Sequence, residues 1–208
     1  MGMKHEERQA DIVQGTIDLC AEEGVGKITT QGIANRIGVA QATIFKHFKN
    51  RDDVFAAVLR WLSGQMFKTI EGEFKKADTS ASQRLQTILT KQLNFANKNR
   101  ALPRILFSDR LHSDSSVLKG IVQNVLRRYI EALTELIKEG QVSGEFATDI
   151  DPLQAAEHIA ASIQGTLMRW SINDFNFDLP AQAEQLYHFN LCSLKVQPET
   201  AQLADKDL

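Results

Sequence analysis

The chain has 208 residues and a formal net charge of -2, with 43% hydrophobic and 24% charged residues. This composition is typical of a globular protein and excludes a disordered or collagen-like chain. No run of about eighteen apolar residues occurs, so no membrane-spanning helix is expected. The first residues, MGMKHEERQ, lack the apolar region of a signal peptide. We therefore expect a cytoplasmic protein that does not bind a membrane.

The hydrophobic pattern near the N-terminus predicts a helix at about residues 6–23 and then two short helices on either side of residues 38–40. The connection between the short helices contains Gly38. Two amphipathic helices joined by a short turn of this kind are typical of a helix-turn-helix, whose second helix, here residues 41–47, is the recognition helix. The apolar positions are Ile33, Ala34 and Ile37 in the first short helix and Ile44, Phe45 and Phe48 in the second.

The charge of this segment is more informative than the charge of the whole chain. No Asp or Glu occurs from Gly26 to Arg51. A local cationic surface favours DNA binding, because Lys and Arg displace the counterions condensed on phosphates. The alternative is a solvated basic face on an ordinary helical bundle. The basic residues are Lys27, Arg36, Lys46, Lys49 and Arg51, and His47 can join them.

Residues 28–52 resemble the DNA-binding domain of the tetracycline-repressor (TetR) family of transcriptional regulators. Three positions depart from the family pattern: Gly32 stands where an acidic residue is common, Ala40 where Ser or Thr usually caps the recognition helix, and Lys49 where Pro or Gly is usual. The matching motifs are Ile28-Thr29-Thr30, Ile33-Ala34, Gly38-Val39, Thr43-Ile44-Phe45, Phe48 and Lys49-Asn50-Arg51-Asp52.

The pattern predicts an all-α fold, and the resemblance implies its division into two parts. Residues 1–52 would form a three-helix domain with the helix-turn-helix, and residues 53–196 a larger helical domain for effector binding and dimerisation. A polar tail, residues 197–208, is expected to be mobile. The larger domain begins with a long helix at about residues 52–74. Further helices are expected at about residues 85–96, 102–106, 115–139, 152–170 and 180–194.

Helical geometry assigns roles to the exposed side of the recognition helix. Side chains opposite Ile44 and Phe48 are predicted to reach base edges in the major groove of a double-stranded operator. The resemblance implies that Phe45 replaces a Tyr whose hydroxyl meets a phosphate. The predicted base-reading or flanking residues are Gln41, Ala42, Thr43, Phe45, Lys46 and His47. The predicted phosphate-binding residues are Thr30, Lys49 and Arg51.

The resemblance also implies a small effector that switches off DNA binding. A mainly apolar pocket is predicted between the short helix near residues 102–106 and the helix at residues 152–170. The same side chains could instead belong to the ordinary core. The predicted effector-binding residues are Leu106, Phe107, Leu111, Gln164, Arg169 and Trp170.

A homodimer is expected, because one helix-turn-helix reads too few base pairs and two related by a dyad read a near-palindrome. The last two long helices are predicted to form its interface. Their stripes could equally face the core of their own chain. The predicted interface residues are Ala156, Ala160, Ile163, Leu167, Leu186, Tyr187, Asn190 and Leu194.

Catalytic motifs are absent from the sequence. It has no phosphate loop, no G-x-S-x-G, no H-E-x-x-H and no C-x-x-C. Asp109, His112 and Asp114 form the one local acid and histidine cluster, and we assign no metal to it. We predict no catalytic residue, no cofactor and no enzymatic activity. The competing hypothesis is an all-helical small-molecule-binding protein or enzyme whose helix-turn-helix is incidental.

Overall fold

The computed structural model describes residues 5–76, 78–111 and 115–195. Within these residues the chain is helical and contains no β-strand, which confirms the predicted all-α fold. The predicted tail at residues 197–208 lies outside the described residues. The helices are α1 (His5–Glu23), the 3-10 helix η1 (Val25–Lys27), α2 (Thr30–Arg36), α3 (Gln41–His47), α4 (Arg51–Phe74), α5 (Ala81–Lys98), α6 (Ala101–Leu106), α7 (Ser116–Val142), α8 (Pro152–Ile172) and α9 (Gln182–Leu194).

Side-chain caps explain where several helices begin. Thr29 accepts a hydrogen bond from the amide of Gly32 at the start of α2, and Asp151 caps α8, which has a proline in its first turn. Asn50 caps α4 by accepting from the amide of Asp53. Ala40 precedes α3 in an extended conformation. It provides no side-chain cap, because its methyl group cannot accept a hydrogen bond.

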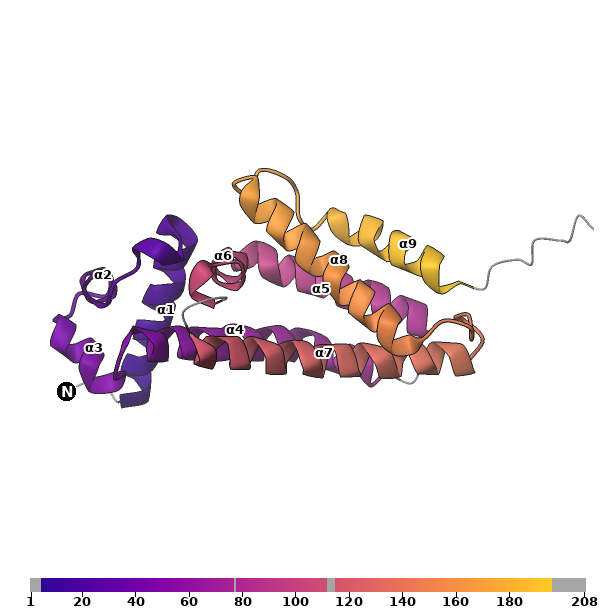
Figure 1. Cartoon of the computed structure of the whole chain (residues 1–208), viewed down its shortest axis with the longest axis horizontal. Helices are drawn as coiled ribbons and strands as arrows, with labels where there is room; N and C mark the ends of the chain where they lie inside the picture. The colour runs from indigo at the N-terminus through magenta and orange to yellow at the C-terminus, as the bar shows by residue number, and fades with distance from the viewer. Residues whose placement is uncertain (1–4, 77, 112–114, 196–208) are drawn as a thin grey trace, which may run out of the picture.

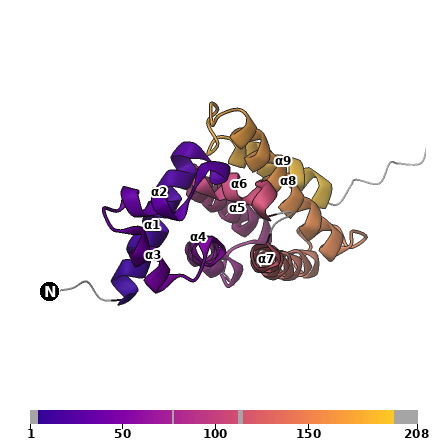
Figure 2. The same ribbon diagram turned by 60° about the vertical axis from the view of Figure 1, so that its left-hand side comes forward.

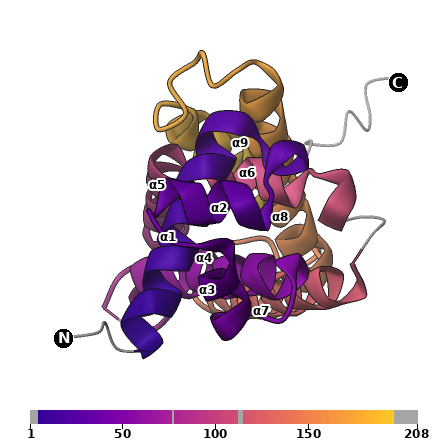
Figure 3. The same cartoon turned by 90° about the vertical axis from the view of Figure 1, so that its left-hand side faces the viewer.

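The molecule is elongated, with the helix-turn-helix at one end (Figure 1). Helices α4 and α7 run side by side along its length, α8 runs obliquely from the end of α7 and packs against it, and α9 packs against α5 (Figures 1 and 2). Figure 3 looks onto the end that carries α2 and α3. Among the described residues, no helix is both long and apolar enough to cross a membrane.

Two hydrophobic clusters make up the interior, and α4 takes part in both. The first cluster combines α1 to α3 with the first part of α4, up to Leu62, and it also includes Ile105 and Leu118 from α6 and α7. The second begins at Phe67 and continues through α5, α7, α8 and α9. The core of the DNA-binding end therefore extends past residue 52, the boundary predicted from the sequence.

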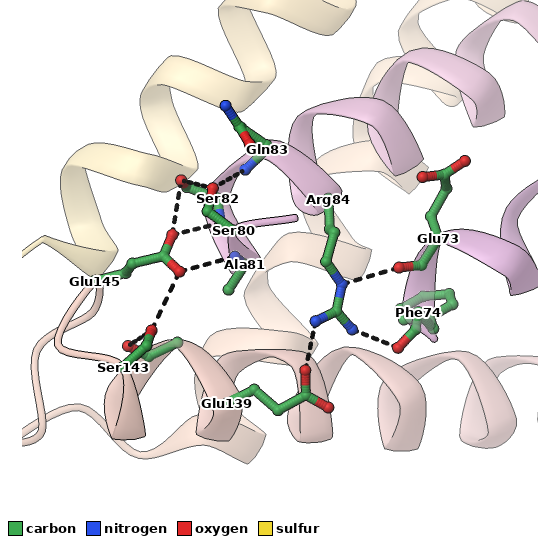
Figure 4. A network of polar contacts seen from close by, with 11 residues as sticks. Glu73, Phe74, Ser80, Ala81, Ser82, Gln83, Arg84, Glu139, Ser143 and Glu145 are labelled. Carbon is green, nitrogen blue, oxygen red and sulfur yellow. Dashed lines mark hydrogen bonds and ion pairs between the residues drawn. The ribbon is translucent and has the colours of Figure 1, made fainter. Parts of the chain in front are cut away.

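A polar network ties the far end of α4 to its neighbours (Figure 4). The buried guanidinium of Arg84 donates hydrogen bonds to the carbonyls of Glu73 and Phe74 and pairs with the carboxylate of Glu139 at 2.5 Å. Nearby, the carboxylate of Glu145 accepts bonds from the amides of Ala81 and Ser82 at the start of α5. The C-terminal end of α4 is thus fixed to α5 and α7.

Candidate DNA-binding surface and ligand cavity

The recognition helix α3 is held against α1 and α2 by its apolar side. Ile44 is fully buried and Phe48 nearly so. Gly15 lets α1 pack closely against the end of α2, because a Cβ at this position would lie 2.4 Å from a methyl carbon of Ile37. Gly38 has a φ of 70°, which only glycine adopts without strain, and it turns the chain from α2 into α3. These contacts fix which side of α3 remains outside.

The outer side of α3 carries Ala42, Phe45 and Lys46, all exposed, with Phe45 half exposed at 50%. Gln41 is half-buried, and its side-chain nitrogen donates a 2.8 Å hydrogen bond to the hydroxyl of Thr30. Thr43 is half-buried beside them. The predicted base-reading residues therefore gather on one face, and Gln41 is oriented by α2.

His47 occupies a different position from the other predicted contacts. Its ring lies 4.3 Å from the ring of His5, centroid to centroid, and is half-buried against α1. Burial, together with the nearby His5, Arg8 and Lys46, lowers the pKa of His47. A lowered pKa favours the neutral imidazole, which reduces the positive charge that His47 adds to this surface.

The predicted phosphate contacts also divide. Lys49 is exposed beside α3, and Thr30 lies at the start of α2. Arg51 instead turns inward: its guanidinium donates a 2.7 Å bond to the carbonyl of Val25 and stacks over the ring of Phe55 at 5.4 Å. In this structure the guanidinium of Arg51 therefore lies away from the exposed side of α3 on which the predicted DNA contacts gather. As the first residue of α4, it points back toward the turn after α1.

One further cation of the acid-free segment is already paired. Arg36 forms a bidentate contact with Glu22 on α1, with nitrogen to oxygen distances of 2.8 and 2.5 Å. The hydrogen bonds to Glu22 raise the pKa of Arg36, and the bonds to Arg36 lower the pKa of Glu22. An acid outside the segment thus offsets part of its charge, which inspection of residues 26–51 alone could not show.

An apolar cavity of about 210 Å³ lies in the body of the molecule, between α4, α6, α7 and α8. Its polar lining groups are Ser63, Gln92, Tyr129 and Gln164. The hydroxyl of Tyr129 donates a 2.7 Å bond to Gln92, and burial raises the pKa of Tyr129. The apolar lining residues are Leu59, Leu62, Met66, Leu102, Leu106, Phe107, Leu111, Ile121, Val122, Val125, Leu126, Ala160, Ile163 and Leu167.

Four of the predicted effector residues line this cavity: Leu106, Phe107, Leu111 and Gln164. The other two predicted residues, Arg169 and Trp170, do not line it. Trp170 is fully buried against Phe175, 4.6 Å between ring centroids, and its indole nitrogen donates to the carbonyl of Phe177. Arg169 is exposed and donates to Gln182. Both side chains face the connection from α8 to α9.

The predicted dimer residues lie on the inner faces of α8 and α9. Tyr187, Asn190 and Leu194 are buried in the body, and Leu186 is partly buried against it. Ala156 is fully buried, while Ala160, Ile163 and Leu167 line the cavity. Seven of these eight side chains are buried within their own chain, and Leu186 is partly exposed. The apolar stripe of each helix was identified correctly, but it faces the chain's own core.

The opposite face of α8 carries small and apolar residues that the core leaves uncovered. Ala161 and Gly165 are exposed, Met168 is 46% exposed and Ile172 68% exposed. On α9, Phe189 is 73% exposed. The four α8 positions follow one another at spacings of three and four residues, so they form one stripe along the helix.

No metal site arises among the described residues: no three His, Cys, Asp or Glu side chains are close enough to hold an ion. His112 and Asp114 of the local acidic cluster lie outside the described residues, so this finding does not cover them. Cys20 is buried and burial raises its pKa to about 12, as expected for an inert thiol.

Two family models match the chain. The model described as bacterial regulatory proteins of the tetR family matches residues 12–58, and the model described as the C-terminal region of YsiA-like proteins matches residues 62–193. Together they span the helix-turn-helix and almost all of the larger helical region. The division between them falls within α4, near the point at which the two hydrophobic clusters meet.

The chain is also similar to individual proteins over most of its length. A fatty acid metabolism regulator protein of Bacillus subtilis is 27% identical over 170 residues, 82% of this chain and 87% of that protein. The nucleoid occlusion factor SlmA of Vibrio cholerae is 23% identical over 177 residues, 85% of this chain and 90% of that protein.

Two solved structures share the fold. The fatty acid degradation regulator FadR of Bacillus halodurans has a TM-score of 0.80 at 23% identity, covering 91% of this chain and 97% of that one. The regulator FadR of Bacillus subtilis, in complex with stearoyl-CoA, has a TM-score of 0.77 at 24% identity, covering 89% and 98%.

Proposed function

Since the chain belongs to the TetR family of bacterial regulatory proteins and is a DNA-binding transcriptional regulator, we propose that it acts as a homodimeric repressor whose release from DNA follows binding of a long-chain amphipathic ligand. The observation that carries this proposal is the position of the apolar cavity. Helix α4 begins beside the helix-turn-helix and lines the cavity with Leu59, Leu62, Ser63 and Met66. A ligand in the cavity therefore touches the helix that carries the DNA-binding end.

The lining supports a ligand that is mainly hydrocarbon. Apolar side chains surround a few polar groups, the arrangement that ligand pockets use to combine affinity with orientation. Stearoyl-CoA, bound by the structurally similar Bacillus subtilis FadR, has an acyl chain of this kind. An acyl thioester is accordingly our preferred class of effector.

The size of the cavity suggests how the ligand would act. Its volume of about 210 Å³ is below the range of about 300–1,000 Å³ common for small-molecule pockets. A long acyl chain must therefore move the lining apart. Because Arg84 fixes the C-terminal end of α4 to α7, the N-terminal half of α4, with the helix-turn-helix attached, is the part left to move.

Movement of α4 would change the distance between the two recognition helices of a dimer. Half-sites on DNA are separated by about 34 to 36 Å, one helical turn, so a changed separation weakens binding. The ligand achieves this only if it binds the non-DNA conformation more tightly. By linkage, operator DNA weakens ligand binding by the same factor, commonly about 1 to 3 kcal/mol of coupling free energy.

The exposed stripe Ala161, Gly165, Met168 and Ile172 on α8, together with Phe189 on α9, is our proposed dimer interface. A stripe of exposed apolar and small residues along a helix is a feature of protein-protein contacts. The absence of long side chains at Ala161 and Gly165 would let α8 approach its symmetry mate closely. This assignment replaces the buried residues predicted from the sequence, while retaining α8 and α9 as the interacting helices.

The test uses an operator selected from random DNA duplexes with the purified protein. Fluorescence anisotropy of that labelled operator should fall when stearoyl-CoA is added to the wild-type protein. Ala160→Phe fills the cavity from α8 with a larger apolar side chain and should retain operator binding while losing the response. Gln86→Phe, at an exposed position of α5 away from both the cavity and the proposed dimer interface, is the control that leaves the cavity unchanged. If no acyl thioester alters operator affinity, the proposed effector class is wrong.

A further inference from the structure

A second hollow adjoins the apolar cavity on the side of the DNA-binding end. It is a cleft of about 660 Å³ formed by the turn after α1, the start of α4, the segment from α6 to Arg110, and the end of α8. Phe107 lines both the cavity and the cleft, so the two hollows meet at this side chain. The cleft is lined by Gly24, Val25, Gly26, Arg51, Pro103, Arg104, Phe107, Ser108, Asp109, Arg110, Met168, Ser171 and Ile172.

Three of these lining residues are arginines from different elements. Arg104 donates bonds of 2.7 and 3.2 Å to the carbonyls of Ala21 and Cys20 at the end of α1. Arg51 donates to the carbonyl of Val25. Arg110 pairs with Asp52. The guanidiniums of Arg51 and Arg104 thus donate their hydrogen bonds to backbone carbonyls rather than to carboxylates.

The cleft carries an excess of positive charge. Three arginines line it against one lining carboxylate, that of the exposed Asp109, and the carboxylate of Asp52 pairs with Arg110. The buried Nε atoms of both Arg51 and Arg110 have no hydrogen-bond partner in the described structure. Burial is the main cause that lowers the pKa of Arg51; the positive charge of Arg110 adds to this effect, and the carboxylate of Asp52 partly offsets it. An anion in the cleft would offset the excess positive charge.

We propose that the Arg51, Arg104 and Arg110 cleft binds the anionic head group of the ligand whose hydrocarbon chain occupies the apolar cavity. This inference rests on the proposed function for the identity of the chain, and it adds the site of the head group. Guanidinium groups suit phosphates and carboxylates, because their planar N-H donors match two oxygens at once. The chain would pass Phe107, which must rotate or shift to join the two hollows.

This location gives the head group a direct connection to the DNA-binding end. Arg51 begins α4 and is bonded to the turn after α1, while Arg104 is bonded to the end of α1 itself. An anion that draws the three guanidiniums together would pull α6 and the segment after it toward these two elements. The head group would therefore contribute to release from DNA, and the hydrocarbon chain alone would act less effectively.

A competing exit from the cavity provides the control. A groove of about 580 Å³ between α4 and α7 shares Ser63, Ile121 and Val125 with the cavity and is flanked by Arg60 and Arg128. Both of these arginines are exposed, and Arg128 already lies 3.8 Å from Glu71 and 4.2 Å over the ring of Phe67. Neither has a buried atom without a partner. We therefore favour the cleft over this groove.

The experiment measures the affinity of the full chain for stearoyl-CoA, stearate and the neutral octadecanol by isothermal titration calorimetry. Ser171→Glu places a negative charge in the cleft without removing any arginine, and Arg110→Met removes one cation. Each should weaken binding of the charged ligands by about tenfold or more, since charge-assisted bonds are the strong ones. Octadecanol affinity should change little. Arg128→Met should leave all three affinities unchanged.

The ligand arms identify the source of the anion. If the cleft variants lose affinity for stearoyl-CoA alone, the cleft binds phosphates. If they lose affinity for stearate equally, the cleft binds a carboxylate. Unchanged affinities in both cleft variants, or a loss produced by Arg128→Met instead, would overturn the cleft assignment and leave the proposed function intact. If the wild-type protein bound none of the three ligands, both the proposed effector and the cleft assignment would be rejected.

Discussion

Tyr129 and Gln92 form a hydrogen bond of 2.7 Å inside the apolar cavity, from the phenolic hydroxyl on α7 to the side-chain oxygen on α5. Both side chains are buried. Since burial raises the pKa of Tyr129, the hydroxyl keeps its proton throughout the neutral pH range and remains a donor. The pair joins two helices across the site where we place the ligand.

Removing that hydroxyl should destabilise the protein. Tyr129→Phe leaves the oxygen of Gln92 buried without its donor, at a cost of about 1 to 3 kcal/mol in the free energy of unfolding. Urea denaturation monitored by circular dichroism measures the change. Tyr187→Phe is the matched control, because the hydroxyl of that buried tyrosine has no hydrogen bond in the described structure. Equal effects of the two substitutions would contradict a specific role for the Tyr129 bond.

The missing cap of the recognition helix can be restored. Ala40→Ser introduces a hydroxyl at a residue whose φ of -71° and ψ of 145° already suit an N-cap, and it should stabilise the protein by about 1 kcal/mol. Thr29→Ala removes the existing cap of α2 and should cost a similar amount. Thermal unfolding of both variants provides the comparison. A lower melting temperature for Ala40→Ser would show that the hydroxyl does not cap α3.

DNA contacts should follow the exposed residues. Lys46→Ala should weaken operator binding by about 1 to 3 kcal/mol if Lys46 reads a guanine, and should change the preferred site. Lys49→Ala should weaken all sequences alike and reduce the salt dependence. Arg51→Lys keeps the positive charge, and because Arg51 points away from the recognition helix, its effect on binding in the absence of ligand should be small. A loss of binding in Arg51→Lys as large as that in Lys46→Ala, with folding intact, would restore Arg51 as a DNA contact.

A charge in the exposed α8 stripe should dissociate the dimer. Gly165→Glu places a carboxylate at the proposed close approach of α8 and its symmetry mate, where burial of an unpaired charge is unfavourable. Size-exclusion chromatography with light scattering should report the monomer mass at micromolar concentration. Gln86→Glu, exposed on α5, is the control. A wild-type protein that is monomeric under these conditions would refute the homodimer itself.

The acid stability of the protein should depend on Glu73. This carboxylate is buried at the end of α4 and accepts hydrogen bonds from Lys76 and Lys91 at 2.8 and 2.6 Å. Those bonds, that from Lys76 foremost, lower its pKa. A carboxylate with a lowered folded-state pKa contributes stability above the unfolded value of about 4.3. That contribution is lost as the pH falls through the folded-state pKa.

Glu73→Gln should therefore lower the free energy of unfolding at pH 7. Below a pH of about 4, the variant and the wild type should become more similar in stability. Urea midpoints measured at both pH values test this. Glu131→Gln removes a carboxylate from an exposed pair with Arg127 on α7, where little stability is expected. If the Glu73→Gln deficit were the same at both pH values, the lysine contacts would not be its cause.

Local signals in the sequence determined much of the fold. Helical spacing, Gly38 and the proline after Asp151 are interactions within a few residues, so they act in the same way whatever the rest of the chain does. For this reason the recognition helix was predicted at residues 41–47, where the structure has it, and α8 was predicted to begin at Pro152. The family resemblance of residues 28–52 likewise depends on local motifs.

Only the tertiary structure decided which neighbour each helical face contacts. Periodicity shows that Ile163 and Leu167 share an apolar face. It does not show whether that face contacts a partner chain or the chain's own core, because both contacts require apolar side chains. The inward turn of Arg51 depends on the Val25 carbonyl, and the pairing of Arg36 depends on Glu22, both from elements packed against it in space. The cavity exists because α4, α6, α7 and α8 meet without filling the space between them. Such contacts arise from helix packing across long sequence separations, and no local pattern encodes them.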